Sequence, residues 1–228
     1  MKKQGLFYGI GVGPGDPELM TVKAINAIKN SDVIIGQKTA LHIAKPYLPP
    51  DAQVVLQTYP MAKDFDKSPD TLENNVKEIL SHLNKGKNVG FLTLGDPMFY
   101  STYIYVFKLL KVAGIKIETV PGVTAFSAVA AKTGYPVACG DEILTIVPAT
   151  ADPDKISDAL KSCDDAVLMK VYKNFHEVAK LLKDEKLAEN AVLVSRCGLD
   201  DEKAVTDITT CKDEDINYLS TILTRRKI

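Results

Sequence analysis

The chain has 228 residues, a length that suits one large domain or two small ones. Hydrophobic residues make up 46% of it and charged residues 25%, as in ordinary soluble globular proteins. The net charge of −1 excludes the global basic field that holds nucleic acid. No segment approaches about 18 uninterrupted apolar residues, and the N-terminal apolar run is too short for a signal peptide. We therefore expect a cytoplasmic protein that binds neither nucleic acid nor membrane.

Cysteine and histidine are scattered along the chain. No C-x-x-C pair occurs, and no cysteine has a histidine at metal-ligand spacing. We expect free thiols in a reducing compartment, no protein-bound metal, and histidines on helix surfaces. The residues concerned are Cys139, Cys163, Cys197, Cys211, His42, His82 and His176.

Strands and helices are predicted to alternate along the first half of the chain. Short apolar runs bounded by turn residues predict strands at 6–10, 32–35, 53–56, 88–94 and 115–119. Apolar residues at helical spacing predict helices at 17–30, 39–44, 70–83, 103–112 and 124–133. This alternation favours a mostly parallel, open sheet with flanking helices, whose ligands bind beyond the carboxyl ends of the strands.

The second half has more strands per residue. Strands are predicted at 143–148, 166–171, 191–195, 204–209 and 218–224, and helices at 156–162 and 175–182. Hairpin-length links favour a mixed sheet there. The sequence therefore predicts two α/β domains, an N-terminal one over residues 1–136 and a C-terminal one over residues 137–228.

A glycine-rich run, Gly9-Ile10-Gly11-Val12-Gly13-Pro14-Gly15-Asp16-Pro17, follows the first predicted strand. It departs from the dinucleotide fingerprint G-x-G-x-x-G, because Pro14 or Asp16 stands where the last glycine belongs. It also lacks the Lys-Ser or Lys-Thr of a P-loop. Since Asp16 would repel phosphate at the start of the next helix, the run predicts backbone that closely approaches a ligand other than a pyrophosphate.

Three motifs, taken in order, resemble those of one family. They are Gly11–Pro17 followed by Leu19 and Thr21, then Gly95-Asp96-Pro97, then Glu118–Ala125. Together with Met169-Lys170 and Tyr218-Leu219-Ser220, they make the sequence similar to the tetrapyrrole (corrin/porphyrin) methyltransferases over nearly the whole chain. The order and spacing of the motifs carry the resemblance, since each alone is weak.

The resemblance implies a two-domain tetrapyrrole methylase fold with the active site in the cleft between the domains. It also implies a homodimer that uses S-adenosyl-L-methionine and releases S-adenosyl-L-homocysteine. The cofactor contacts implied are Pro14, Leu94, Gly95, Asp96, Met98, Thr124, Ala125, Met169 and Tyr218.

Three of these residues also have structural interpretations. Asp96 before Pro97 is typical of a turn shaped by its own carboxylate. Thr124 suits the N-cap of the following helix. By composition alone, Met169 is a core residue.

Within the family, one branch is the most similar. The segment Gly95–Tyr103, the loop Tyr59-Pro60-Met61 and the C-terminal Tyr218–Arg226 resemble enzymes that methylate C20 of precorrin-2 or cobalt-factor II in cobalamin biosynthesis. Leu94 stands where uroporphyrinogen methyltransferases have a further glycine. Two alternatives remain of the same fold, methylation at another ring position and diphthine synthesis. A dinucleotide-dependent oxidoreductase is the distant alternative, which the broken fingerprint disfavours.

Catalysis of C20 methylation needs little acid–base help, because this meso carbon is electron-rich in a reduced tetrapyrrole. Alignment of donor and acceptor supplies much of the acceleration. A proton must still leave C20, and Asp16 is the candidate base, with capping or loop shaping as its alternative role. A polycarboxylate macrocycle needs cations and flat apolar faces. The candidate substrate-binding residues are Tyr59, Met61, Phe99, Tyr100, Lys170 and Arg196.

Overall fold

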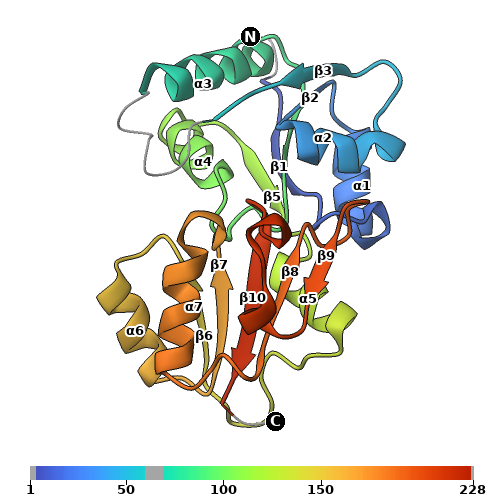
Figure 1. Ribbon diagram of the computed structural model, residues 1–228. Helices are drawn as coiled ribbons and strands as arrows, with labels where there is room; N and C mark the ends of the chain where they lie inside the picture. The colour runs from blue at the N-terminus through green and yellow to red at the C-terminus, as the bar shows by residue number, and fades with distance from the viewer. Residues whose placement is uncertain (1–3, 60–68, 227–228) are drawn as a thin grey trace. The chain divides into compact units, whose positions relative to one another are not determined.

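The computed structural model describes residues 4–59 and 69–226. The chain divides into two compact units, Met1–Thr124 and Ala125–Ile228, and the described part of each contains one five-stranded sheet (Figure 1). The sequence placed the boundary after residue 136, beyond helix α5 (Ala125–Thr133). The structure instead groups α5 with the second unit, because this helix packs on strand β10 of the second sheet.

The first sheet is parallel and open, as predicted. Its strand order is β3-β2-β4-β1-β5, with β1 pairing in parallel with both β4 and β5. The carboxyl ends of these strands share one edge, so the loops after β4, β1 and β5 are neighbours. The strands are β1 (Phe7–Gly11), β2 (Val33–Gly36), β3 (Gln53–Leu56), β4 (Val89–Thr93) and β5 (Ile117–Val120).

Helix α4 packs closely on the first sheet through aromatic side chains. The ring centroid of Tyr103 lies 6.2 Å from that of Phe7 and 6.0 Å from that of Phe91. A Cβ atom at Gly9 would lie 2.1 Å from the Tyr103 ring, so only glycine permits this approach. The described helices of this unit are α1 (Val22–Lys29), α2 (Lys38–Ala44), α3 (Pro69–Asn84) and α4 (Tyr103–Val112), and the 3₁₀ turn η2 (Lys45–Tyr47) follows α2.

Two sequence predictions fail in the first unit. The helix expected over residues 17–30 is two elements, the 3₁₀ turn η1 (Pro17–Leu19) and α1, separated by the extended residue Met20. The break arises because Thr21 acts as an N-cap, its hydroxyl accepting from Ala24 N at 3.1 Å. His82 was expected on a helix surface, but it is buried in α3, and burial lowers its pKa.

The second sheet is mixed, also as predicted. Its order is β6-β7-β10-β8-β9, with β6 parallel to β7 and β10 antiparallel to both β7 and β8. The strand predicted over 204–209 ends early, because the Asp207 side chain caps a 3₁₀ turn, η5 (Ile208–Thr210). The strands are β6 (Leu144–Pro148), β7 (Asp165–Met169), β8 (Ala191–Ser195), β9 (Lys203–Val205) and β10 (Ser220–Arg225).

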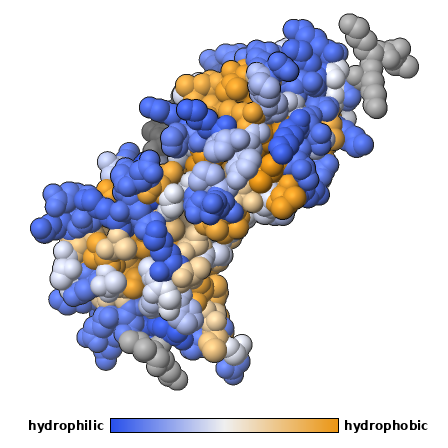
Figure 2. Space-filling view, turned by 90° about the vertical axis from the view of Figure 1, so that its right-hand side faces the viewer, coloured by the Kyte–Doolittle hydropathy of each residue, from blue (hydrophilic) through white to orange (hydrophobic). Residues whose placement is uncertain are grey.

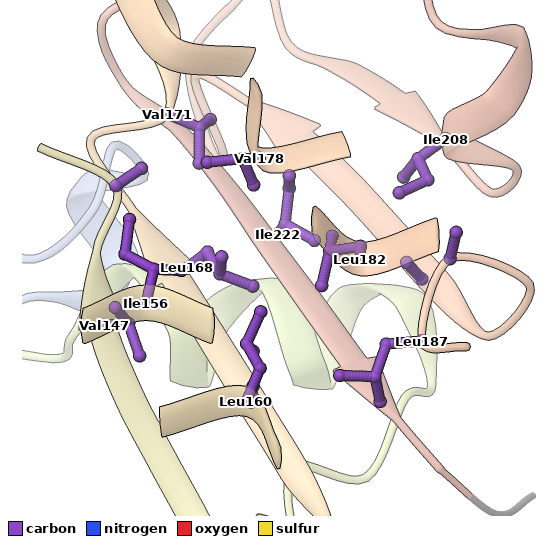
Figure 3. Packing of buried hydrophobic residues seen from close by; sticks show 14 of the residues in the cluster. Val147, Ile156, Leu160, Leu168, Val171, Val178, Leu182, Leu187, Ile208 and Ile222 are labelled. Carbon is purple, nitrogen blue, oxygen red and sulfur yellow. The ribbon is translucent and has the colours of Figure 1, made fainter. Parts of the chain in front are cut away.

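Helices cover both faces of the second sheet. On one face, α6 (Pro153–Lys161) and α7 (Phe175–Asp184) bury side chains such as Leu160 and Leu182 against Leu168 and Ile222 (Figure 3). Each such fully buried leucine contributes about 1.5–3 kcal/mol to folding. The opposite face is covered by α5, which contacts β10. Two further 3₁₀ turns, η4 (Tyr172–Asn174) and η6 (Asp213–Asp215), belong to this unit.

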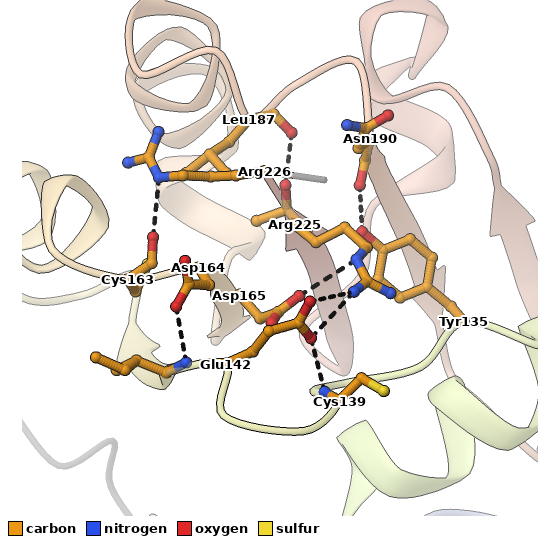
Figure 4. Close-up of polar contacts among 12 residues, drawn as sticks. Tyr135, Cys139, Glu142, Cys163, Asp164, Asp165, Leu187, Asn190, Arg225 and Arg226 are labelled. Atoms are coloured by element: carbon orange, nitrogen blue, oxygen red, sulfur yellow. Dashed lines mark hydrogen bonds and ion pairs between the residues drawn. The ribbon is translucent and has the colours of Figure 1, made fainter. Parts of the chain in front are cut away.

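Ionic side chains close one end of the second sheet (Figure 4). Arg225, the last residue of β10, donates to both carboxylate oxygens of Glu142 at 3.0 and 3.1 Å. Its Nε lies 3.5 Å from Asp165, the buried first residue of β7. Burial, and then the nearby charge of Glu142, raise the pKa of Asp165 to about 6. Four predicted site residues of this unit lie at the opposite end of the same sheet.

Candidate active site

The loops after β1 and β4 are joined directly through their backbones. Gly95 N donates to Gly13 O at 2.8 Å, and Gly13 N donates to Gly95 O at 3.3 Å. Both glycines have positive φ, 78° for Gly13 and 67° for Gly95, in the left-handed region that other residues rarely adopt. Gly13 and Gly95 therefore allow the backbones of the two loops to pair.

The loop after β5 fits against the same pair of loops. A Cβ atom at Gly122 would lie 2.2 Å from Gly95 O, and one at Gly11 would lie 2.6 Å from both Gly95 O and Gly122 N. Neither distance is possible for a real side chain. At Gly11 and Gly122 the close approach is therefore made by neighbouring loops. The approach of the glycine-rich run to a ligand stays a prediction.

The Asp96 carboxylate links the loop after β4 to the loop after β5. Its Oδ1 accepts from Met98 N at 2.8 Å, which forms an Asx turn, and its Oδ2 accepts from Gly122 N at 3.1 Å. The turn-shaping role of Asp96 is therefore present. A carboxylate has further acceptor positions, so a contact with ribose hydroxyls is compatible with these bonds.

Asp16 likewise has a structural role. Its Oδ1 accepts from Glu18 N at 2.8 Å and caps the turn η1. The Thr21 hydroxyl contacts Pro121 O at 3.4 Å, which gives a second link between the first and third loops. The capping role foreseen for Asp16 is present, and its role as a base stays a prediction.

Apolar side chains project from these loops. Met98 is 48% exposed, Tyr100 40% and Leu19 38%. The rings of Phe99 and Tyr100 pack edge to face, with centroids 4.9 Å apart. Tyr100 has a φ of 49°, which strains a residue with a side chain. The edge therefore combines polar main chain with exposed apolar surface.

In the second unit, four of the predicted site residues come to one sheet edge. Because β10 is antiparallel to β7 and β8, its start lies beside their ends, with Thr221 opposite Met169. Arg196, which follows β8, donates its N–H to Leu219 O at 3.2 Å. The residues brought to this edge are Met169, Lys170, Arg196 and Tyr218.

Strain and charge coincide at this second edge. Lys170 and Arg196 have φ values of 61° and 55°, a conformation uncommon for non-glycine residues. Burial lowers the pKa of the Lys170 ammonium, and the Arg196 guanidinium is paired with Asp201. Tyr218, which precedes β10, is half exposed. Because strained backbone concentrates at functional sites, these two cations are the strongest candidates in the unit.

Tyr59 is partly buried and packs against the core of the first unit. Its ring packs edge-on against Phe91 with centroids 5.8 Å apart, and its hydroxyl donates to the Gln57 side-chain oxygen. Burial raises its pKa. Met61, the other residue predicted in this loop, lies outside the described residues. Contact of either residue with substrate stays a prediction.

Two hydroxyl residues that flank the loop after β4, Thr93 and Ser101, were not among the predicted site residues. Their hydroxyl oxygens lie 2.6 Å apart. A hydroxyl residue on each side of the Gly95-Asp96-Pro97 motif was the signal available in the sequence.

Comparison with known proteins decides the family. The family model of tetrapyrrole (corrin/porphyrin) methylases matches residues 6–211. The chain belongs to this family.

Several relatives among the tetrapyrrole methylases are similar to most of the chain. The cobalt-precorrin-2 C(20)-methyltransferase of Salmonella typhimurium is 33% identical over 98% of this chain and 97% of its own length. The precorrin-2 C(20)-methyltransferase of a Sinorhizobium species is 30% identical over 96% and 94%. The cobalamin biosynthesis protein CobIJ of Mycobacterium tuberculosis is 34% identical over 86% of this chain, which spans only 41% of that longer relative.

Solved structures of tetrapyrrole methylases share the fold. A cobalt precorrin-4 methyltransferase superposes with a TM-score of 0.81 at 26% identity, over 96% of this chain and 94% of its own. A uroporphyrin-III C-methyltransferase from Thermus thermophilus, solved in complex with S-adenosylhomocysteine, superposes with a TM-score of 0.72 at 20% identity, over 97% and 98%.

Within residues 4–59 and 69–226, no three His, Cys, Asp or Glu side chains come together as metal ligands. Over the same residues, every helix is too short or too polar to cross a bilayer. Figure 2 shows one face, on which hydrophilic residues surround smaller hydrophobic areas.

Proposed function

We propose that this chain transfers the methyl group of S-adenosylmethionine to C20 of precorrin-2 or cobalt-factor II in cobalamin biosynthesis. The observation that carries the proposal is the similarity to a cobalt-precorrin-2 C(20)-methyltransferase over 98% of the chain. The three motif loops also support the proposal. They carry the family resemblance, and they contact one another at one edge of the first sheet.

The methyl donor fits the first unit's loop edge chemically. A nucleoside and an amino-acid group need main-chain partners and apolar cover, and this edge has polar main chain beside the exposed side chains of Leu19 and Met98. The exposed Tyr218 ring offers a further flat face in the second unit. We assign donor contacts to Pro14, Leu94, Gly95, Asp96, Met98, Thr124, Ala125, Met169 and Tyr218.

The acceptor carries several carboxylates around a flat ring. Lys170 and Arg196 supply cations at one edge of the second sheet, and guanidinium and ammonium groups are the natural partners of carboxylates. Phe99 and Tyr100 supply aromatic surface. We assign these four residues to the acceptor, together with Tyr59 and Met61.

The sulfonium donor, when bound, supplies a methyl group whose bond to sulfur breaks as the bond to C20 forms, the electron pair staying on sulfur. The chain's own contribution is alignment, since oriented reactants gain effective molarities of about 10⁵–10⁸ M. The second contribution is to accept the proton that leaves C20. We assign this to Asp16, whose Oδ2 is left for it while Oδ1 caps η1.

We also propose a cellular compartment and an oligomeric state for the protein. We propose a cytoplasmic homodimer, as the family resemblance implies, with any cobalt carried inside the substrate. Light scattering on the purified protein tests the dimer, and a single-chain mass would contradict it.

The decisive experiment offers labelled S-adenosylmethionine with metal-free precorrin-2 and with cobalt-factor II. We expect one added methyl group on at least one acceptor, located at C20 by NMR, with S-adenosylhomocysteine as co-product. A methyl group at another ring position would overturn the C20 assignment. Tight NAD binding without affinity for S-adenosylmethionine would overturn the whole proposal.

A further inference from the structure

A pair of hydroxyl groups closes the loop after β4 at its base. Thr93 Oγ1, at the end of β4, lies 2.6 Å from Ser101 Oγ, just before α4. Ser101 is buried, and its Oγ also accepts from Tyr103 N at 3.1 Å. The two ends of the segment 94–100 are therefore joined to each other and to the first turn of α4.

The segment held by this pair contains one strained residue, Tyr100, whose φ of 49° is unusual for a residue with a side chain. Gly95 is left-handed too, with a φ of 67°, which glycine adopts without strain. Tyr100 directly precedes Ser101, so the hydroxyl pair holds the neighbour of the strained residue. A conformation of this kind persists only where the surrounding contacts enforce it.

The same segment presents the groups assigned to the methyl donor. Gly95 bonds to Gly13, and the Asp96 carboxylate bonds to Met98 N and Gly122 N. These contacts fix the middle of the segment, and the Thr93–Ser101 pair fixes its ends. When a loop is already fixed before the ligand binds, no binding free energy is lost to ordering it.

We infer that Thr93 and Ser101 are positioning residues that hold the segment 94–100 in its donor-binding conformation. This inference rests on the proposed function, and it concerns residues that act through the loop rather than on the ligand. Breaking the pair lets the segment populate other conformations, and the apparent affinity for the donor falls by the fraction that remains competent.

The test compares Thr93→Val and Ser101→Ala with a matched control, Tyr103→Phe. The control removes another hydroxyl pair of the same unit, Tyr103 with Thr119 at 2.6 Å, which joins α4 to β5 and leaves the loop ends intact. Calorimetric titration with S-adenosylhomocysteine gives the dissociation constant, and thermal unfolding gives the stability. We expect about tenfold weaker binding for both loop variants. We expect unchanged binding for the control at a similar loss of stability, and recovery with Thr93→Ser.

The outcomes separate the inference from the proposed function. Wild-type affinity in Thr93→Val and Ser101→Ala, or equal weakening in Tyr103→Phe, would overturn the positioning role. Wild-type protein that binds S-adenosylhomocysteine but leaves precorrin-2 and cobalt-factor II unmethylated would overturn the proposed function alone. Amide exchange at Met98 and Phe99, whose N–H groups donate to Asp96, gives a second measurement on ligand-free protein. Faster exchange in Thr93→Val than in wild type supports the positioning role, whereas equal exchange overturns it.

Discussion

The two units place their candidate site residues at sheet edges by opposite means. In the first unit, glycines let three loops meet backbone to backbone, as at Gly95 and Gly122. In the second unit, Lys170 and Arg196 take left-handed backbone without being glycine. The first edge therefore depends on glycines, which have no side chain, whereas the second edge has charged side chains on strained backbone.

The largest effect is expected where a side chain is added to the first edge. Gly122→Ala forces a Cβ against Gly95 O, so we expect about 3 kcal/mol of lost stability and loss of donor binding. Chemical denaturation and titration with S-adenosylhomocysteine measure both.

Gly114→Ala is the matched control for Gly122→Ala. Its φ is positive, at 71°, whereas that of Gly122 is not, and nothing lies within 4 Å of an added Cβ. It should cost only about 1 kcal/mol and leave donor binding intact. Equal effects of the two variants would show that the contact of an added Cβ with Gly95 O does not explain the glycine at position 122.

Asp16→Asn tests whether a side chain at the first edge acts as a catalytic base. Asparagine caps helical turns about as well as aspartate, so the fold should be kept. If the Asp16 carboxylate takes the C20 proton, single-turnover rates fall about 100-fold with donor affinity unchanged. Full turnover with normal donor binding would show that Asp16 is not the base and only caps η1 by accepting from Glu18 N.

Glycine substitutions probe the second edge in the opposite sense. Lys170→Gly and Arg196→Gly relieve left-handed strain, so each should gain up to about 1 kcal/mol of stability. Each removes a cation, so kcat/KM for the tetrapyrrole should fall about tenfold. Lys186→Gly is the control, since Lys186 has a φ of 58° just after α7 and away from this edge.

The control separates strain from function at these positions. Lys186→Gly should gain stability without any change in kcat/KM. Unchanged kcat/KM in Lys170→Gly and Arg196→Gly as well would make the second edge an ordinary set of turns.

The smallest effect on activity is expected at the opposite end of the second sheet, where charged side chains serve the fold. The pKa of Asp165 is raised in the folded state, so folded protein binds the proton more tightly and its stability contribution falls as pH rises from about 4 to about 6. Asp165→Asn lacks this titration. The variant's unfolding free energy should rise relative to wild type across that window, by about 3 kcal/mol.

Parallel pH series of wild type and Asp165→Asn check this sign by urea denaturation. Taking the difference between the two proteins cancels other carboxylates, such as Asp215, whose pKa is lowered by its hydrogen bonds. A difference that is flat between these pH values would show that Asp165 is ionised normally beside Arg225.

Much of the architecture was predictable because its signals are local. Apolar periodicity predicted α4 at Tyr103–Val112 and β8 at Ala191–Ser195 with the bounds the structure shows. Helix 17–30 was wrong because Asp16 and Thr21 each cap a separate element, and side-chain caps compete with helix continuation. Periodicity does not register such competition.

By itself, the sequence determined the α/β class, the parallel and mixed sheets and the family, since alternation and motif order are written along the chain. Only the tertiary structure decided which groups meet: that Gly11, Gly95 and Gly122 exclude side chains from one another, that α5 joins the second sheet, and that Lys170 and Arg196 take left-handed backbone at one edge. The physical reason is that these contacts join residues far apart in sequence. They exist only once strand order and register bring the loop ends together.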